Sequence, residues 1–128
     1  IDFTGHGCVN CREMEANVWS DPRVLEMLRN EYVIIALYVD DKTTLPEDEW
    51  MLNSKGKKKK TSIGSKNSAF QISKFEANAQ PYYCLMGHNG ELLVEPRSYD
   101  LDKDAFVDFL KKGVETFNNG TSIRNIFE

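Results

Sequence analysis

The sequence has 128 residues, of which 41% are hydrophobic and 28% charged, and its formal net charge is -4. This length suits one domain with a core large enough to fold alone, and the negative charge argues against a general nucleic-acid binder. No stretch approaches the roughly 20 apolar residues of a membrane span, and no signal peptide is visible.

The chain starts with Ile1 instead of Met, inside a strand that we expect over residues 1–4. We therefore interpret it as a fragment of a longer protein, whose other segments cannot be inferred from this one. The three cysteines are too few for a disulfide-stabilised scaffold, and their odd number leaves Cys84 without an obvious partner.

The first half of the chain predicts two helices followed by a strand. Apolar residues at helical spacing indicate a helix over residues 8–19. Ser20-Asp21-Pro22 then interrupts the pattern, and Pro22 suits the first position of a second helix. Residues 32–39 form a nearly continuous, β-branched apolar run, which is typical of a strand buried on both faces.

Residues 41–68 lack regular periodicity and contain the run Lys57–Lys60, so we interpret them as an inserted lid or hairpin that is partly mobile. A helical pattern returns at residues 69–77, and residues 81–86 are a strand candidate.

The C-terminal third predicts a hairpin and a last helix. Asn89-Gly90 is a strong signal for a two-residue hairpin turn, which places a return strand at residues 91–94. Apolar residues at helical spacing then predict an amphipathic helix over residues 102–118, ended by Asn119-Gly120.

The most informative motif is Cys8-Val9-Asn10-Cys11 at the start of the first helix. Two thiols at this spacing can form and reopen a disulfide, because the helix N-terminus favours a thiolate on the first sulfur and the second lies one turn away. A zinc site normally needs four ligands, and Cys84, His6 and His88 provide no second spaced pair. Haem attachment would require a histidine where Arg12 stands. We therefore favour a redox pair over a zinc-bound or inert one.

Two carboxylates are candidates for tuning these thiols. Asp2 lies in a strand that should be central, where a buried carboxylate is costly and could exchange a proton with Cys11. Glu15 lies one turn after Cys11 and would disfavour a thiolate, whereas Arg12 would act oppositely. The alternatives are an edge-exposed strand acid for Asp2 and a solvated helix charge for Glu15.

The residues between the cysteines bear on the direction of electron flow. Val9 and Asn10 add no positive charge between the sulfurs. Strong oxidants owe their power to a stabilised reduced thiolate, so this motif favours a reductant.

Three further features have simple structural interpretations. Pro81, in Gln80-Pro81, can merely open a strand, and Cys84 is expected to be a buried, unreactive core residue. The Lys57–Lys60 run is interpreted as a solvated loop, with a dock for an acidic partner as the alternative.

Taken together, Asp2-Phe3, the motif Cys8–Arg12 and Gln80-Pro81 before a hairpin and an amphipathic last helix resemble the thioredoxin superfamily. The segments DFTGHGCVNCREME and FEANAQPYY are similar to the active-site and proline loops of one of its members. That member is the C-terminal, thioredoxin-like domain of the DsbD family, the bacterial transmembrane thiol:disulfide interchange and cytochrome c biogenesis proteins. The resemblance covers nearly the whole chain apart from residues 41–68.

This resemblance implies an α/β thioredoxin-like fold, a mixed central sheet flanked by helices, with a long insertion and a truncated N-terminus. It implies a periplasmic domain, itself soluble, tethered to the inner membrane. Such a domain takes electrons from a membrane-embedded electron-carrier domain of the same protein and passes them to oxidised periplasmic proteins, without a metal or an organic cofactor. A free-standing periplasmic thioredoxin or disulfide isomerase, and a non-redox thioredoxin-like binding module, are the alternatives.

The resemblance also assigns roles to residues. Cys8 would be the attacking thiol and Cys11 the resolving one, with Asp2 and Glu15 as the acidic pair that tunes them. The Gln80-Pro81 segment would contain the cis-proline beside the disulfide, and the Gln80 backbone would pair with an extended partner segment.

The chain departs from the family's pattern at two places. Gly7 stands where thioredoxins commonly have a tryptophan, which leaves the rim of the motif less covered. The insertion is long and rich in lysine, which leaves the choice of partner open.

Overall fold

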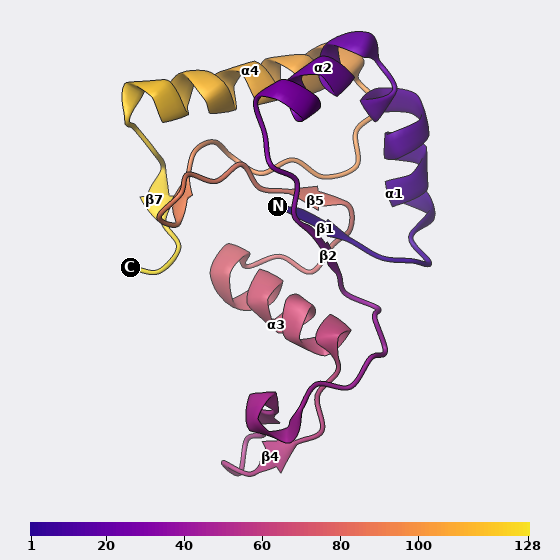
Figure 1. Cartoon of the computed structure of the whole chain (residues 1–128), viewed down its shortest axis with the longest axis vertical. Coiled ribbons are helices and arrows are strands. Elements are labelled where there is room, and N and C mark those ends of the chain that lie inside the picture. Colours follow the sequence, from indigo (N-terminus) through magenta and orange to yellow (C-terminus); the bar gives the residue numbers. More distant parts are fainter.

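The computed structural model describes residues 1–128 and has a small central sheet between helices, with a hairpin that projects from one end (Figure 1). Its helices are α1 (Val9–Met14), the π-helical turn η1 (Glu15–Trp19), α2 (Pro22–Asn30), the 3-10 turn η2 (Glu47–Glu49), α3 (Ile63–Phe75) and α4 (Lys103–Asn119). Its strands are β1 (Asp2–Thr4), β2 (Ala36–Tyr38), β3 (Met51–Leu52), β4 (Lys58–Lys59), β5 (Tyr82–Tyr83), β6 (Glu91–Leu92) and β7 (Arg124–Asn125).

The central sheet has the strand order β2-β1-β5 and is mixed. β1 is parallel to β2, with Phe3 opposite Leu37, and antiparallel to β5, with Phe3 opposite Tyr82. A bridge between Tyr83 and Arg97 extends the sheet beyond β5. The expected mixed sheet of an α/β fold is therefore confirmed.

Two hydrophobic cores cover the two faces of this sheet, as alternating side chains of a strand require. Residues of α1, η1, α2 and α4 pack with Tyr83 in the larger core. Phe3 packs on the opposite face with Phe75, at the end of α3. Figure 1 shows this layering, with α1, α2 and α4 on one side of the sheet and α3 on the other.

Local sequence signals account for the helix boundaries. Asp21 caps α2 by accepting the backbone N–H of Arg23, and Pro22 occupies the first helical position as expected. Asp102 caps α4, which ends at Gly120 in the left-handed conformation with φ of 69°. The helix expected over residues 8–19 is present, although its second half is π-helical.

The expected strand over residues 32–39 is wrong in extent and burial. β2 comprises only Ala36–Tyr38, and Val33, Ile34 and Ile35 before it are 88%, 47% and 53% exposed. β2 pairs with β1 alone and is therefore an edge strand in this chain. A continuous apolar run predicts burial only when neighbours cover both faces.

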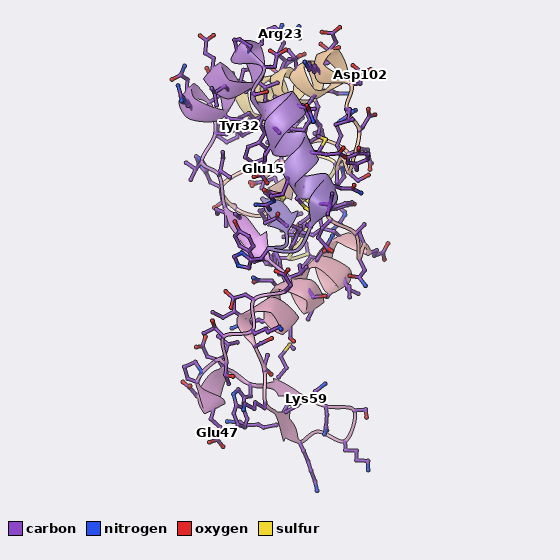
Figure 2. The ribbon with its side chains drawn as sticks, turned by 90° about the vertical axis from the view of Figure 1, so that its right-hand side faces the viewer. Glu15, Arg23, Tyr32, Glu47, Lys59 and Asp102 are labelled. Carbon is purple, nitrogen blue, oxygen red and sulfur yellow. A yellow bond between two sulfur atoms is a disulfide. The ribbon has the colours of Figure 1, made fainter.

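The insertion is a hairpin, and it ends earlier than expected. The strands β3 and β4 pair with Met51 opposite Lys59, and this hairpin extends beyond α3, away from α2 and α4 (Figure 2). The next helix, α3, begins at Ile63 and not at residue 69, because Ser62 caps it by accepting the backbone N–H of Ser65.

A hairpin is present at Asn89-Gly90 as predicted, but its turn is not the two-residue one. Met86 forms a bridge with Leu92 and the Gly87 N–H donates to the Glu91 carbonyl, which leaves residues 88–90 in the turn, and Gly90 has a φ of +90° that favours glycine. The regular part of the return strand is only β6, which pairs with β7 near the C-terminus. Residues 124–125 show no strand signal in the sequence, because β7 is too short for an alternating pattern.

The helices of this structure are too short or too polar to cross a membrane.

Candidate functional site

Three loops meet at one edge of the sheet. Since β1 and β2 are parallel, their carboxyl ends lie at the same edge, and antiparallel β5 begins there. The loop after β1 leads to Cys8, the loop after β2 becomes the insertion, and the loop before β5 contains Gln80-Pro81. Residues far apart in the sequence therefore gather around the cysteine motif.

Cys8 and Cys11 form a disulfide at the N-terminus of α1, with an S–S distance of 2.07 Å. Cys8 is the N-cap residue, and its Sγ accepts the backbone N–H of Cys11 at 3.2 Å. Cys8 is half-buried, whereas Cys11 is only 1% exposed. A partner can therefore reach Cys8 far more readily than Cys11.

The loop before Cys8 is held by Asp40, at the end of β2. The Asp40 carboxylate accepts the backbone N–H groups of His6 and Gly7, each at 2.9 Å. These two hydrogen bonds lower the pKa of Asp40, which stays ionised at neutral pH. The His6 ring stacks on Tyr38, with ring centroids 4.1 Å apart. The end of β2 thus fixes the approach to the disulfide.

Asp2 is buried in the middle strand, on the same side of the sheet as α1. It lies opposite Tyr83 in the antiparallel ladder, so both side chains point into the larger core. Its side chain is 6% exposed, and its Oδ1 atom has no hydrogen-bond partner. Burial, with a further contribution from the charge of Glu15, raises the pKa of Asp2 to about 6. The edge-exposed alternative for Asp2 is wrong.

Arg12 connects α1 to the end of β1 by hydrogen bonds, and its positive charge partly offsets the negative charges of Asp2 and Glu15. Its guanidinium donates to Thr4 Oγ1 at 3.0 Å and to the Gly5 carbonyl at 3.1 Å. It also forms an ion pair with Glu15 at 3.3 Å. The Arg12 charge opposes the increase in the Asp2 pKa, although burial remains the largest effect. Glu15 is thus paired and half-buried, and it acts on Asp2 through its charge.

Gln80-Pro81 is a cis peptide bond, and it lies next to β5. Extending the β1–β5 register by one residue places Pro81 opposite Thr4, at the edge where the disulfide lies. The Gln80 side chain donates to Gln71 Oε1 at 2.8 Å, and Gln71 donates to the Ala79 carbonyl at 2.8 Å. The backbone groups of Gln80 make no hydrogen bond within the chain. They are free to pair with an extended segment.

The third cysteine lies apart from this site. Cys84 is fully buried in the core that contains Phe3 and Phe75, and burial raises its pKa to about 12. The expectation of a buried core thiol is confirmed. No three His, Cys, Asp or Glu side chains gather where they could hold a metal ion.

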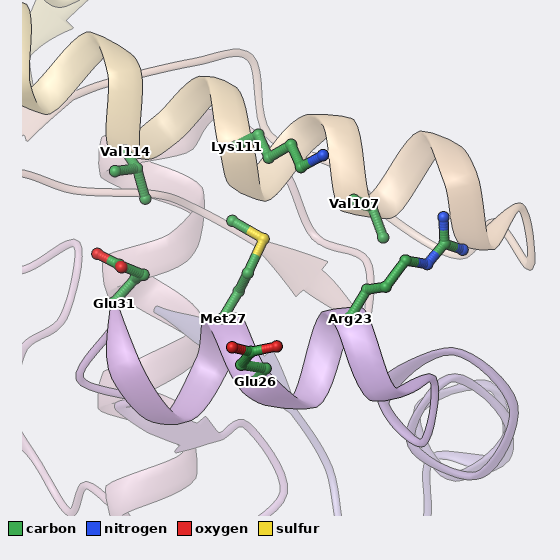
Figure 3. Close-up of a pocket in the computed structure, with 7 residues that line it drawn as sticks. All are labelled: Arg23, Glu26, Met27, Glu31, Val107, Lys111 and Val114. Atoms are coloured by element: carbon green, nitrogen blue, oxygen red, sulfur yellow. The ribbon is translucent and has the colours of Figure 1, made fainter.

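A groove between α2 and α4 lies away from the cysteine motif (Figure 3). Its rim carries both signs of charge, including Arg23, Glu26 and Lys111, and Met27 and Val107 form part of its apolar lining. None of the residues predicted for the site lines this groove.

Two positioning residues were missed by the sequence reasoning. Asp40 directly precedes the insertion and carries no motif of its own, and the fully buried Gln71 lies within the helical pattern of residues 69–77. Asp40 follows a strand parallel to β1, which is a recognisable signal for the active edge of an α/β sheet. Gln71 gave no signal, because its partners depend on the tertiary packing of α3.

The fold and this site define a thioredoxin-like protein with a redox-type cysteine pair. The chain belongs to the thioredoxin-like domain family, whose family model matches residues 1–113. A comparison with curated proteins gave no significant match. Thiol–disulfide oxidoreductase chemistry is typical of such a domain when it carries a close Cys pair, as Cys8 and Cys11 are here.

Proposed function

We propose that this domain is a protein-disulfide reductase that passes electrons by dithiol–disulfide exchange to oxidised proteins. One observation carries the proposal: the Cys8–Cys11 disulfide lies at the N-terminus of α1 with Cys8 half-buried and Cys11 buried. This asymmetry supports attack by Cys8 and resolution by Cys11. A disulfide that only stabilised the loop would not require one cysteine to be more exposed than the other.

The exchange proceeds in two steps from the reduced domain. The Cys8 thiolate attacks one sulfur of the partner's disulfide, which forms a mixed disulfide and releases the partner's other sulfur as a thiolate. The Cys11 thiolate then attacks Cys8 Sγ, which closes the Cys8–Cys11 bond and releases the partner's second thiolate. Two electrons pass to the partner, whose two thiolates take up two protons. A dithiol donor restores the reduced domain by the reverse steps.

Asp2 is suited to accept the proton of the Cys11 thiol. It lies buried on the face of the sheet that α1 covers, with an oxygen that has no protein partner. Its pKa of about 6 lies near neutral pH, where a carboxylate exchanges protons efficiently, here through a water molecule. Glu15 adds negative charge and disfavours a stabilised thiolate, which supports the reducing direction.

Gln80-Pro81 supplies the docking edge. The free backbone groups of Gln80 lie at the same edge of the sheet as Cys8 and can pair with an extended segment around the partner's disulfide. This pairing would hold one partner sulfur in line with Cys8.

The setting we propose is that of the DsbD family: a periplasmic domain tethered to the inner membrane. A membrane-embedded carrier domain of the same protein would be the dithiol donor, and oxidised periplasmic proteins, including those of cytochrome c biogenesis, the acceptors. The active-site and proline-loop segments support this setting. A free-standing periplasmic thioredoxin or isomerase would use the same exchange chemistry.

Trapping of the mixed disulfide tests the mechanism. The reduced Cys11→Ser variant should form a stable adduct through Cys8 with a peptide disulfide, because the resolving thiol is absent. Mass spectrometry of the non-reduced protein would detect it. The matched Cys8→Ser variant, whose remaining thiol is buried, should form at least about tenfold less adduct. Equal trapping by both variants, or by neither, would contradict the proposal.

A further inference from the structure

The insertion begins at the edge of the sheet where Cys8 lies, and it carries a structured hairpin that is rich in lysine. We call residues 46–60 the basic arm. Asp40, which holds the loop before Cys8, directly precedes the insertion. The arm leaves the domain at the start of α3 and projects beyond this helix, at the far end from Glu15, where Figure 2 labels Lys59. A protein bound at Cys8 can contact the arm if it also covers this side of α3.

Hydrogen bonds give the arm a defined shape. At its base, the Leu45 N–H donates to the Thr61 carbonyl at 2.8 Å. Thr61 is 2% exposed, and its Oγ1 accepts the Met51 N–H at 2.9 Å. At the tip, the Asn53 N–H donates to the Lys57 carbonyl at 2.8 Å. The arm is thus a built hairpin and not only a solvated loop.

The arm concentrates positive charge on an acidic protein. Its five lysines are all exposed, and none of them forms an ion pair. They are Lys55, Lys57, Lys58, Lys59 and Lys60. The whole chain has a formal net charge of -4, so the residues other than these lysines carry -9. The arm also contains Glu47, Asp48 and Glu49 in η2, so its formal net charge is +2 and its positive charge is concentrated in residues 55–60.

We propose that the basic arm is a docking surface for an acidic protein that carries the disulfide to be exchanged at Cys8. This inference rests on the proposed function. The arm's position favours a protein, because only a macromolecule bound at Cys8 can extend past α3 to the arm. Leu52 is the arm's one strongly exposed large apolar side chain, so the arm has little to insert into a lipid bilayer. The unpaired lysines select a negative partner and accelerate its association.

Two peptide substrates test the arm. Each contains one intramolecular disulfide and a flexible tail, made of about ten glutamates in one peptide and about ten glutamines in the other. The rate constant for oxidation of the reduced domain should be about tenfold larger with the glutamate tail at about 0.02 M salt. This ratio should approach one at about 0.5 M salt, where charges are screened.

Charge-neutral variants locate the effect. In K57Q/K58Q/K59Q, the preference for the glutamate tail should fall to about twofold or less. In the matched control K103Q/K111Q/K112Q, which removes three exposed lysines from α4, it should persist. Equal losses in both variants would show that only net charge matters and would overturn the inference. A second result would also overturn the inference: the wild-type domain binds phosphatidylglycerol vesicles, K57Q/K58Q/K59Q does not, and neither prefers the glutamate tail. The arm would then be a contact for lipid.

A small neutral substrate separates this inference from the proposed function. Both lysine variants, K57Q/K58Q/K59Q and K103Q/K111Q/K112Q, should react with hydroxyethyl disulfide at the wild-type rate, because this exchange needs only the cysteines. Failure of the wild-type domain to react would overturn the proposed function. Normal reaction without a preference for the glutamate tail would overturn the inference about the arm alone.

Discussion

At the scale of single residues, one buried carboxylate lies beneath the helix that carries the cysteine pair. Asp2 is held in the middle strand without a partner for Oδ1, and burial raises its pKa to about 6. A pKa shift of one unit corresponds to about 1.4 kcal/mol, so the change from 3.8 amounts to about 3 kcal/mol. The folded state therefore holds a proton on Asp2 more tightly than the unfolded chain does.

Asp2→Asn should stabilise the oxidised domain increasingly as the pH rises. Below about pH 4 the carboxyl is protonated in both states, and above about pH 6 the folded state carries the full cost of the buried charge. The free energy of unfolding of the variant, relative to wild type, should increase by up to about 3 kcal/mol between pH 4 and pH 7. Urea unfolding at both pH values measures it.

The matched control is Asp108→Asn, at an exposed position of α4, which should show little such change. If the Asp2→Asn difference were the same at pH 4 and pH 7, the raised pKa of Asp2 would be wrong.

At the scale of elements, the junction between β2 and α3 sets where the insertion begins and ends. The Gly64 N–H donates to the Asp41 carbonyl at 2.9 Å, so the start of α3 lies directly against the chain leaving β2. A Cβ on Gly64 would lie 2.6 Å from the Val39 carbonyl oxygen and 2.7 Å from two backbone atoms of Asp41. Only glycine allows this approach.

Gly64→Ala should destabilise the domain by about 2 kcal/mol, because backbone atoms cannot move aside as a flexible side chain can. This cost exceeds the roughly 1 kcal/mol that alanine gains over glycine in a helix. Urea unfolding would measure it, with Ser73→Ala at an exposed position of the same helix as the control. Equal or greater stability of Gly64→Ala would mean that α3 and β2 are not in such close contact.

At the scale of the whole molecule, the insertion is separate from the packing that stabilises the fold. Neither hydrophobic core includes a residue of the insertion, and the two ends of the insertion are joined by a bridge between Thr44 and Ser62. The sheet and its helices therefore hold the cysteine motif without help from the basic arm.

Replacement of residues 46–60 by Asn-Gly should leave a cooperatively folded domain. The new turn would join Leu45 to Thr61, whose backbones are already hydrogen-bonded. The free energy of unfolding should change by less than about 2 kcal/mol, and the Cys8–Cys11 disulfide should still form. Urea unfolding and thiol counting are the measurements. A loss of the cooperative transition would show that the arm contributes to the core.

Local patterns were sufficient for much of the fold and for the centre of the site. The helix at Cys8, the Pro22 start of α2, the Asn89-Gly90 turn and the last helix all follow from short-range signals. The structure bears out the burial of Asp2 in a middle strand. The roles of Asp2, Glu15, Gln80 and Pro81 in exchange stay predictions.

Other features could not be obtained this way. The run over residues 32–39 gives only a short edge strand, because burial depends on which neighbours are present. The start of α3 at Ile63 depends on a single capping serine within a polar segment. β7 consists of two residues that are strand only because β6 pairs with them.

The sequence by itself determined the cysteine pair, its helical setting and the class of chemistry, since residue spacing and helix geometry are local properties. Three features depend on the tertiary structure alone. Asp40 binds the backbone of the loop before Cys8, and Gln71 binds the Gln80 side chain. The lysine run forms one strand of a hairpin. The physical reason is that these contacts join residues distant in the chain. Their partners are fixed by the pairing of strands and the packing of helices.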